Sequence, residues 1–193
     1  MTFSSPQAEE RWRQGFRYLN RFMVLMYRLG LARWLQPWPR VTGRILVLVH
    51  QGRKSGLVRR TPLNYAVVDG ELYVTAGFGA VSDWYRNIRA NPKVEVWLPD
   101  GWWTTVAEEI GDGPDRLRLL RAVLVGSGFA APVFGVGPRL PDDRLEELTG
   151  EYRVLRLHRT GTRTGAGGPG NLAWVWPLAT ALLLWRRRCC RPG

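Results

Sequence analysis

Residues 45–68 read ILVLVHQGRKSGLVRRTPLNYAVV, two apolar runs joined by a basic segment from His50 to Pro62. Short apolar runs beside turn-forming residues are typical of buried strands. The segment between them has four cations and two glycines, and glycine lets a tight turn present backbone N–H groups to an anion. Arginine binds phosphate and carboxylate through paired hydrogen bonds. We therefore expect a strand–loop–strand unit that binds a phosphate or carboxylate. The alternative is a hairpin loop with solvated charges.

Further strands are expected along the chain. Asp69-Gly70 is a strong two-residue hairpin turn. Later segments alternate apolar and polar residues, which is the period of a half-buried strand. We expect strands at residues 44–49, 62–68, 72–76, 94–98, 102–107 and 152–157, and helices at 12–30, 82–91, 114–125 and 141–148. These short strands predict an α+β, mainly β, fold: a small barrel of about six antiparallel strands with flanking helices.

Three segments are expected: an N-terminal basic amphipathic helix in residues 1–40, the barrel in 41–158, and a glycine-rich linker with an apolar, basic tail in 159–193. The N-terminal helix suits either the protein's own core or an anionic membrane surface. The apolar run Leu172 to Trp185 is shorter than the ~20 residues that span a bilayer. It suits either a membrane interface, with tryptophans at the headgroups, or an apolar groove of the barrel.

The positive charge is concentrated near the N-terminus. Of a net charge of +12, the whole excess lies between Arg11 and Val68, which contain twelve cations and no acid. This predicts an anionic partner: a charged cofactor, a lipid surface or nucleic acid. No nucleic-acid motif is present, so we expect no nucleic-acid partner. The two cysteines, Cys189 and Cys190, are adjacent, and neither a disulfide framework nor a metal site is expected.

The N-terminus has acids and arginines and no clean apolar stretch of a secretory signal. We therefore expect a cytoplasmic protein. Because of the basic helix and the tryptophan-rich tail, we also expect the protein to bind peripherally to the inner face of the cell membrane.

Two motifs resemble a known family. The first is Gly52-Arg53-Lys54-Ser55-Gly56 with Arg59, Pro62 and Leu63. The second is Asp83-Trp84-Tyr85-Arg86-Asn87 followed by Arg89-Ala90-Asn91-Pro92. Together they resemble the deazaflavin-dependent nitroreductases, a family also described as quinone reductases that use coenzyme F-420. The resemblance covers about residues 45–107, roughly a third of the chain.

The resemblance implies a split β-barrel that binds F-420, an 8-hydroxy-5-deazaflavin, and passes hydride from its ring to a small-molecule acceptor. The cofactor's phosphate and oligoglutamate tail are anionic, which agrees with the basic loop. Position by position, the implied cofactor-binding residues are Arg53, Lys54, Ser55, Gly56, Arg59, Pro62, Ala76, Gly77, Trp84 and Asn87. FMN is an alternative cofactor whose phosphate could use the same cations. A homodimer is a further expectation at the level of the family.

The expected reaction is hydride transfer to a flat organic acceptor: a quinone, a nitro compound or an enone. Phe78, Phe129 and Phe134 are expected to bind this acceptor, and Tyr65, with His50 second, to donate the proton. A strand tyrosine and a single histidine also suit purely structural roles. The competing hypothesis is a non-catalytic deazaflavin- or FMN-binding protein at a membrane surface.

Overall fold

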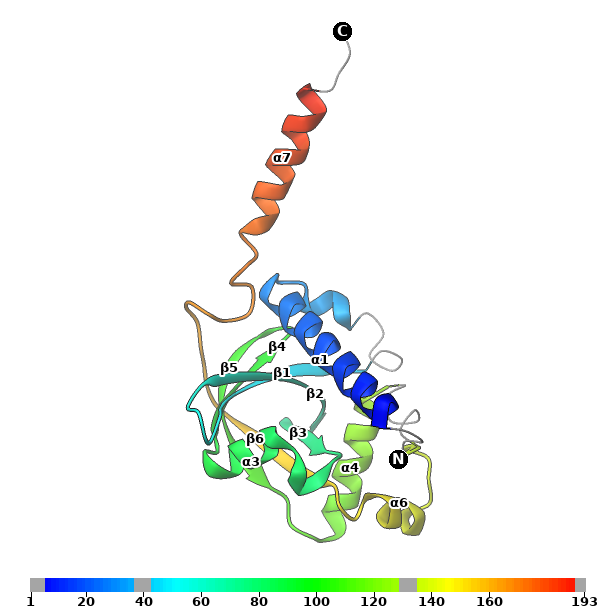
Figure 1. The fold of residues 1–193 in the computed structure, drawn as a ribbon. Coiled ribbons are helices and arrows are strands. Elements are labelled where there is room, and N and C mark those ends of the chain that lie inside the picture. The colour runs from blue at the N-terminus through cyan, green and yellow to red at the C-terminus, as the bar shows by residue number, and fades with distance from the viewer. Residues whose placement is uncertain (1–5, 37–42, 129–134, 190–193) are drawn as a thin grey trace.

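The computed structural model describes residues 6–36, 43–128 and 135–189, and its centre is a closed six-stranded β-barrel (Figure 1). Around the barrel the strands follow the order β1–β2–β3–β6–β5–β4, and all neighbours are antiparallel, including the β4–β1 pair that closes it. The strands are β1 Ile45–Gln51, β2 Val58–Val68, β3 Glu71–Ala76, β4 Lys93–Leu98, β5 Gly101–Glu109 and β6 Arg153–Thr162. The predicted mainly-β barrel is confirmed.

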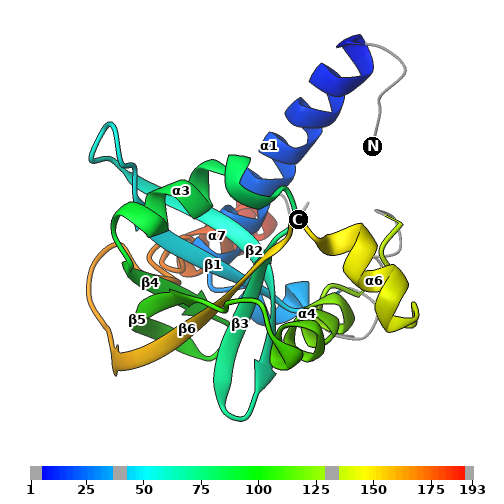
Figure 2. The same cartoon turned by 90° about the horizontal axis from the view of Figure 1, so that it is seen from below.

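Helices flank the barrel on several sides. They are α1 Pro6–Arg28, α3 Asp83–Ala90, α4 Pro114–Gly126, α6 Asp142–Thr149 and α7 Val175–Cys189, with short 3-10 turns η1 Ala32–Leu35 and η2 Gly79–Val81. In Figure 2, α4 and α6 lie together on one side of the barrel and α3 lies on another. The N-terminal part of α1 extends past the strands in the same view.

Strand β1 is apolar throughout because both of its faces are covered. Leu46 and Leu48 point into the barrel interior and pack with residues of the other strands. Val47 and Val49 point outward and pack beneath Tyr27 of α1, which is fully buried. Successive side chains on a strand alternate faces, so a strand between two apolar layers needs an unbroken apolar run.

Two strands exceed their predicted lengths by the most. β2 begins at Val58 rather than Pro62, because its first residues pair with β1 as far as Gln51. The loop is therefore only residues 52–57, and Arg59 lies on the strand rather than in the loop. β6 continues to Thr162, where its last residues pair with β5, so it crosses the expected boundary at residue 158. The division into three segments remains a prediction.

The hairpin between β2 and β3 turns at Asp69-Gly70 as predicted. Both residues have positive φ, 51° and 81°. This conformation matches the right-handed twist of the paired strands, which is why glycine is favoured there.

The C-terminal end of α1 contacts the segment that leads into α7. The backbone amide of Leu172 donates to the carbonyl of Arg28 at 2.8 Å, and the Trp176 indole donates to Leu29 at 2.9 Å. Beyond these contacts α7 extends away from the barrel (Figure 1), so the structure does not show the tail in a barrel groove. Among the described residues, no helix has both the length and the apolar character that a bilayer crossing requires.

Candidate functional site

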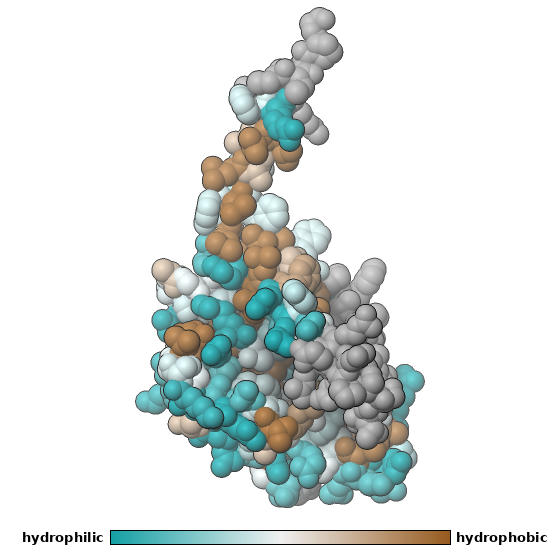
Figure 3. Space-filling model, in the orientation of Figure 1, coloured by the Kyte–Doolittle hydropathy of each residue, from teal (hydrophilic) through white to brown (hydrophobic). Residues whose placement is uncertain are grey.

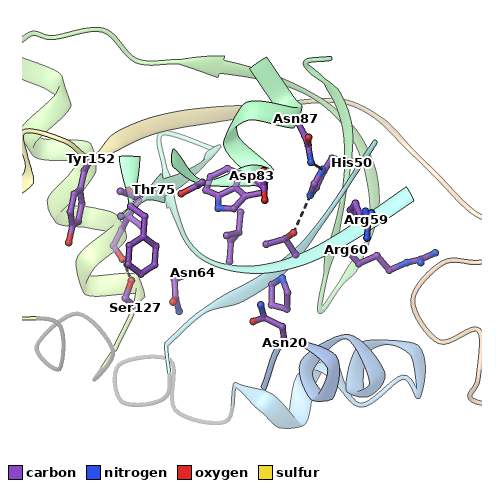
Figure 4. Close-up of a pocket in the computed structure, with 18 of the residues that line it drawn as sticks. Asn20, His50, Arg59, Arg60, Asn64, Thr75, Asp83, Asn87, Ser127 and Tyr152 are labelled. Atoms are coloured by element: carbon purple, nitrogen blue, oxygen red, sulfur yellow. Dashed lines mark hydrogen bonds between the residues drawn. The ribbon is translucent and has the colours of Figure 1, made fainter. Parts of the chain in front are cut away.

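A cleft of about 970 Å³ lies between β2, the end of β3, α3 and α4, and Asn20 of α1 borders it as well. Its size is at the upper end of small-molecule sites, which are roughly 300–1,000 Å³. Figure 4 shows two unlike sides. Arg59 and Arg60 lie on one, and the labelled residues Asn64, Thr75, Ser127 and Tyr152 lie on the other.

The basic side of the cleft is formed by Lys54, Arg59 and Arg60. The guanidinium of Arg60 lies 5.2 Å from the centre of the Trp97 ring, a cation–π contact that leaves its charge uncompensated. In the described part of the chain no carboxylate forms an ion pair with any of these three cations. Like charges held close together without a counter-ion favour binding of an anion.

Arg53 has a different role from the other three cations because its partners are within the protein. Its guanidinium donates to the carboxylate of Asp83 and to Oδ1 of Asn87, each at 3.0 Å. Its backbone amide donates to the same Asn87 oxygen at 3.1 Å. These bonds attach the β1–β2 loop to α3 and so hold the basic side of the cleft in place.

His50 continues this network into the mouth of the barrel. Its ring Nδ1 lies 3.3 Å from Nδ2 of Asn87, and Nε2 lies 3.1 Å from the hydroxyl of Thr61 (Figure 4). The side chain is 4% exposed. Burial lowers the pKa of His50 below its ordinary value, and the nearby charge of Arg59 lowers it further. A backbone hydrogen bond with Gln51 opposes this shift without reversing it, so the ring is neutral at pH 7.

The other side of the cleft is polar but uncharged. Thr75 contributes a hydroxyl that is buried and has no hydrogen-bond partner among the described residues, so a ligand atom can satisfy it. Tyr152 packs its ring on the backbone of Gly77, where a built Cβ would be 3.6 Å from the ring carbon Cζ. Burial raises the pKa of Tyr152, so its phenol stays protonated at neutral pH. This side can therefore donate hydrogen bonds or a proton.

Residues 19–129, more than half of the chain, match the family described as F420H(2)-dependent quinone reductase. The chain belongs to this family. The suspected relationship to deazaflavin-dependent reductases is confirmed.

Several solved structures are similar to this family member. One is a conserved hypothetical protein from Mycobacterium tuberculosis, with 21% identity, 65% of this chain and 85% of that chain covered, and a TM-score of 0.46. A second is an F420-H2 dependent reductase, with 22% identity, 60% of this chain and 94% of that chain covered, and a TM-score of 0.42. A third is a heme storage protein from Vibrio cholerae, with 12% identity, 72% and 94% covered, and a TM-score of 0.44.

The cleft brings together most of the residues that the sequence analysis expects at the site. Those that line it are His50, Arg53, Lys54, Arg59, Pro62, Gly77, Phe78, Trp84 and Asn87. Ser55 and Gly56 do not line it. Ser55 instead accepts a hydrogen bond from the Leu57 amide, and Gly56, with φ of 66°, provides the turn. Both therefore shape the loop rather than face the cleft.

Tyr65 and Ala76 lie deeper, in the barrel interior, with exposures of 9% and 1%. The structure thus does not bring Tyr65, the first expected proton donor, to the cleft. His50 does reach it, but both ring nitrogens already have protein partners. Phe129 and Phe134, expected to bind the acceptor, lie outside the described residues.

Sequence reasoning missed the uncharged side of the cleft. The sequence predicts Tyr152 only as the start of a strand and Asn20 only as part of a helix, and Ser127 lies just beyond the helix expected at 114–125. No local pattern marks them, because each comes from an element far from the motifs in sequence. The sequence offers one signal for Tyr152, which is a tyrosine at the start of a predicted strand. The pairing of that strand with β3 is visible only in the structure.

Proposed function

We propose that this protein is a reductase that uses reduced coenzyme F-420 as hydride donor and a flat organic compound, such as a quinone, as acceptor. The observation that carries this proposal is the polarity of one cleft: cations without an ion pair among the described residues on one side, protonated neutral groups on the other. Such a cleft suits a cofactor with an anionic arm next to an uncharged acceptor.

The residues present fit the cofactor. Lys54 and Arg59, which have no ion pair with any described residue, are the cations for its phosphate and glutamate carboxylates, and Arg53 keeps the β1–β2 loop in position. Pro62 and Gly77 line the part of the cleft in which we place the planar ring. When bound, the deazaflavin supplies the hydride, and the protein contributes orientation, charge and exclusion of water.

Tyr152 is our proposed proton donor in place of Tyr65. Its phenol is protonated at neutral pH and its ring borders the cleft beside Gly77. Trp84 and the exposed Phe78 are further aromatic residues that border the same cleft, and both can contact a flat acceptor. Tyr152→Phe should lower kcat with little change in cofactor affinity, since phenylalanine keeps the ring and loses only the donor.

An equilibrium titration with reduced F-420, followed by a screen of quinones, nitro compounds and enones, tests the proposal. Arg59→Ala should weaken binding by about 10- to 100-fold, since a hydrogen bond to a charged group contributes about 1.5–3 kcal/mol. Arg139→Ala is the matched control, because Arg139 is exposed and borders a different depression. Failure of the unaltered protein to bind the cofactor at micromolar concentration would end the proposal.

The same experiment separates the alternatives. Binding of F-420 without turnover of any acceptor would favour a non-catalytic carrier. Preferential binding of FMN would change the cofactor, because FMN has a phosphate but no glutamate tail. The homodimer also remains a prediction, and light scattering of the purified full chain tests it.

We propose in addition that the two ends of the chain bind an anionic membrane surface. Seven large apolar residues from Trp174 to Trp185 are 45% to 64% exposed, and Figure 3 shows apolar surface along this projecting helix. A helix that is apolar on all sides is normally covered by protein or lipid. No acid follows Glu151, and arginines occupy positions 186–188, which favours anionic lipid as the cover.

Helix α1 extends the same surface toward the cleft. Tyr18, Leu19, Phe22 and Leu25 are exposed along it, and Asn20 between them borders the cleft. A lipid-bound α1 would thus put the cleft next to a membrane in which apolar quinones dissolve.

Sedimentation with vesicles tests this attachment. The full chain should bind vesicles with anionic lipid and bind neutral vesicles weakly, and deletion of residues 172–193 should release it. Leu183→Asp provides a milder variant, because Leu183 is 60% exposed and its replacement leaves the barrel intact. Equal binding by all three proteins would refute the attachment. If the protein instead dimerises with increasing concentration and the deletion abolishes this, a second copy of the chain covers the apolar surface of α7.

A further inference from the structure

The orientation of the Asn87 amide determines the direction of a hydrogen-bond chain in the cleft wall. Two N–H groups of Arg53, one from the backbone and one from the guanidinium, point at the same atom of this amide. Only the amide oxygen can accept both bonds. The amide nitrogen of Asn87 must therefore face His50, and it can only donate.

The tautomer of His50 follows from this orientation. Its Nδ1 faces an N–H donor, so Nδ1 must accept and carries no proton. The ring is neutral and buried, so the remaining proton is on Nε2. Nε2 then donates to the oxygen of Thr61, 3.1 Å away.

Thr61 consequently has a hydroxyl proton to donate elsewhere. Its oxygen already accepts from His50, so its own O–H cannot point back at the ring. Among the described residues Thr61 has no acceptor for this proton, and its side chain lines the cleft. On β2 it is two residues from Arg59, so the two side chains share one strand face.

We propose that Thr61 is a cofactor-binding residue that donates a hydrogen bond to a phosphate oxygen beside Arg59, and that Asn87 and His50 are positioning residues that keep this hydroxyl turned outward. The choice of ligand atom rests on the proposed function. The direction of the chain from Asn87 through His50 to Thr61 does not, because it depends on protein atoms alone.

Nitrogen NMR on the protein without ligand tests the direction of the chain. The protein has two histidines, His50 and His158, and His158→Gln assigns the signals of His50 without touching the cleft. Long-range proton–nitrogen correlations at neutral pH should show His50 as the neutral tautomer with its proton on Nε2. A proton on Nδ1, or a charged ring, would overturn the proposal whether or not the protein binds F-420.

A pair of Thr61 variants tests the ligand contact. Thr61→Val removes the hydroxyl with little change in shape and should weaken binding of F-420 by about tenfold, the usual effect of losing a hydrogen bond to a charged group. Thr61→Ser retains the donor and should bind within about twofold of the unaltered protein.

The control ligand is the same deazaflavin without phosphate and glutamate. Its affinity should be equal for the unaltered protein and Thr61→Val. Unchanged F-420 binding by Thr61→Val, or an equal loss for the shorter ligand, would overturn the phosphate contact. If the unaltered protein binds neither ligand, the proposed function and the ligand contact fail together, while the histidine tautomer still decides the direction of the chain.

Discussion

Replacement of Asn87 by alanine should lower the free energy of unfolding by about 2–4 kcal/mol. Asn87 is 6% exposed and bonds to two other elements. Its loss leaves the buried His50 Nδ1 and the Arg53 amide without partners, and each such group costs about 1–3 kcal/mol. The Arg53 guanidinium adds little, because it retains Asp83 and is partly exposed to water. The expected loss of 2–4 kcal/mol therefore comes from two groups, His50 Nδ1 and the Arg53 backbone amide. The Arg53 amide is the more accessible to water, so its cost lies at the lower end of the range.

Urea and thermal denaturation measure this effect. For a chain of this length the midpoint should fall by about 4–16 °C, since each kcal/mol corresponds to about 2–4 °C. The matched control is Asn91→Ala, at the end of the same helix, where the side chain accepts from the exposed Lys93 amide. This control should cost no more than about 1 kcal/mol. Equal losses in the two variants, or a loss below about 0.5 kcal/mol for Asn87→Ala, would refute the network as the source of stability.

Three further predictions concern packing, pH and the acceptor. Gly126→Ala should destabilise by about 3 kcal/mol or more in urea denaturation, because its Cβ would lie 2.3 Å from the Tyr65 carbonyl oxygen, whereas Gly111→Ala, with open space around it, should be nearly neutral. Stability should be full well above the unfolded histidine pKa of about 6.5 and should decrease as the pH falls through that value, because burial and the charge of Arg59 lower the folded pKa of His50 and the unfolded chain takes up the proton first. His50→Gln should remove that part of the slope near and below about pH 6.5, and an unchanged slope would contradict a neutral buried ring. Phe78→Ala should raise the KM for a quinone several-fold at unchanged stability, because the side chain borders the cleft and is 70% exposed; an unchanged KM would exclude it from the acceptor site.

Much of the barrel could be predicted because its signals are local. The unbroken apolar run of β1 and the Asp69-Gly70 turn each depend on neighbours within a few residues. The positions at which strands begin and end were predicted less accurately. Val58 to Thr61 look like part of a basic loop, and only their pairing with β1 makes them strand. Pairing energy comes from the partner strand, which a local pattern does not contain.

The basic side of the cleft was also predictable, since Arg53, Lys54 and Arg59 are close together in the sequence. Their different roles were not. Arg53 is held by Asp83 and Asn87 from α3, whereas Arg59 has no such partner in the described structure. The difference depends on where α3 packs against the loop.

The sequence by itself determined the strand pattern, the tight turn, the charge block and the family motifs, because each is written in consecutive residues. Only the tertiary structure decided that Tyr152 stands beside Gly77, that Tyr65 is buried below the cleft, and that His50 is neutral with both nitrogens engaged. These facts depend on barrel closure and on helices packing over its open end. Burial and hydrogen-bond partners from distant segments, rather than residue type, then set which group is charged and which proton is free.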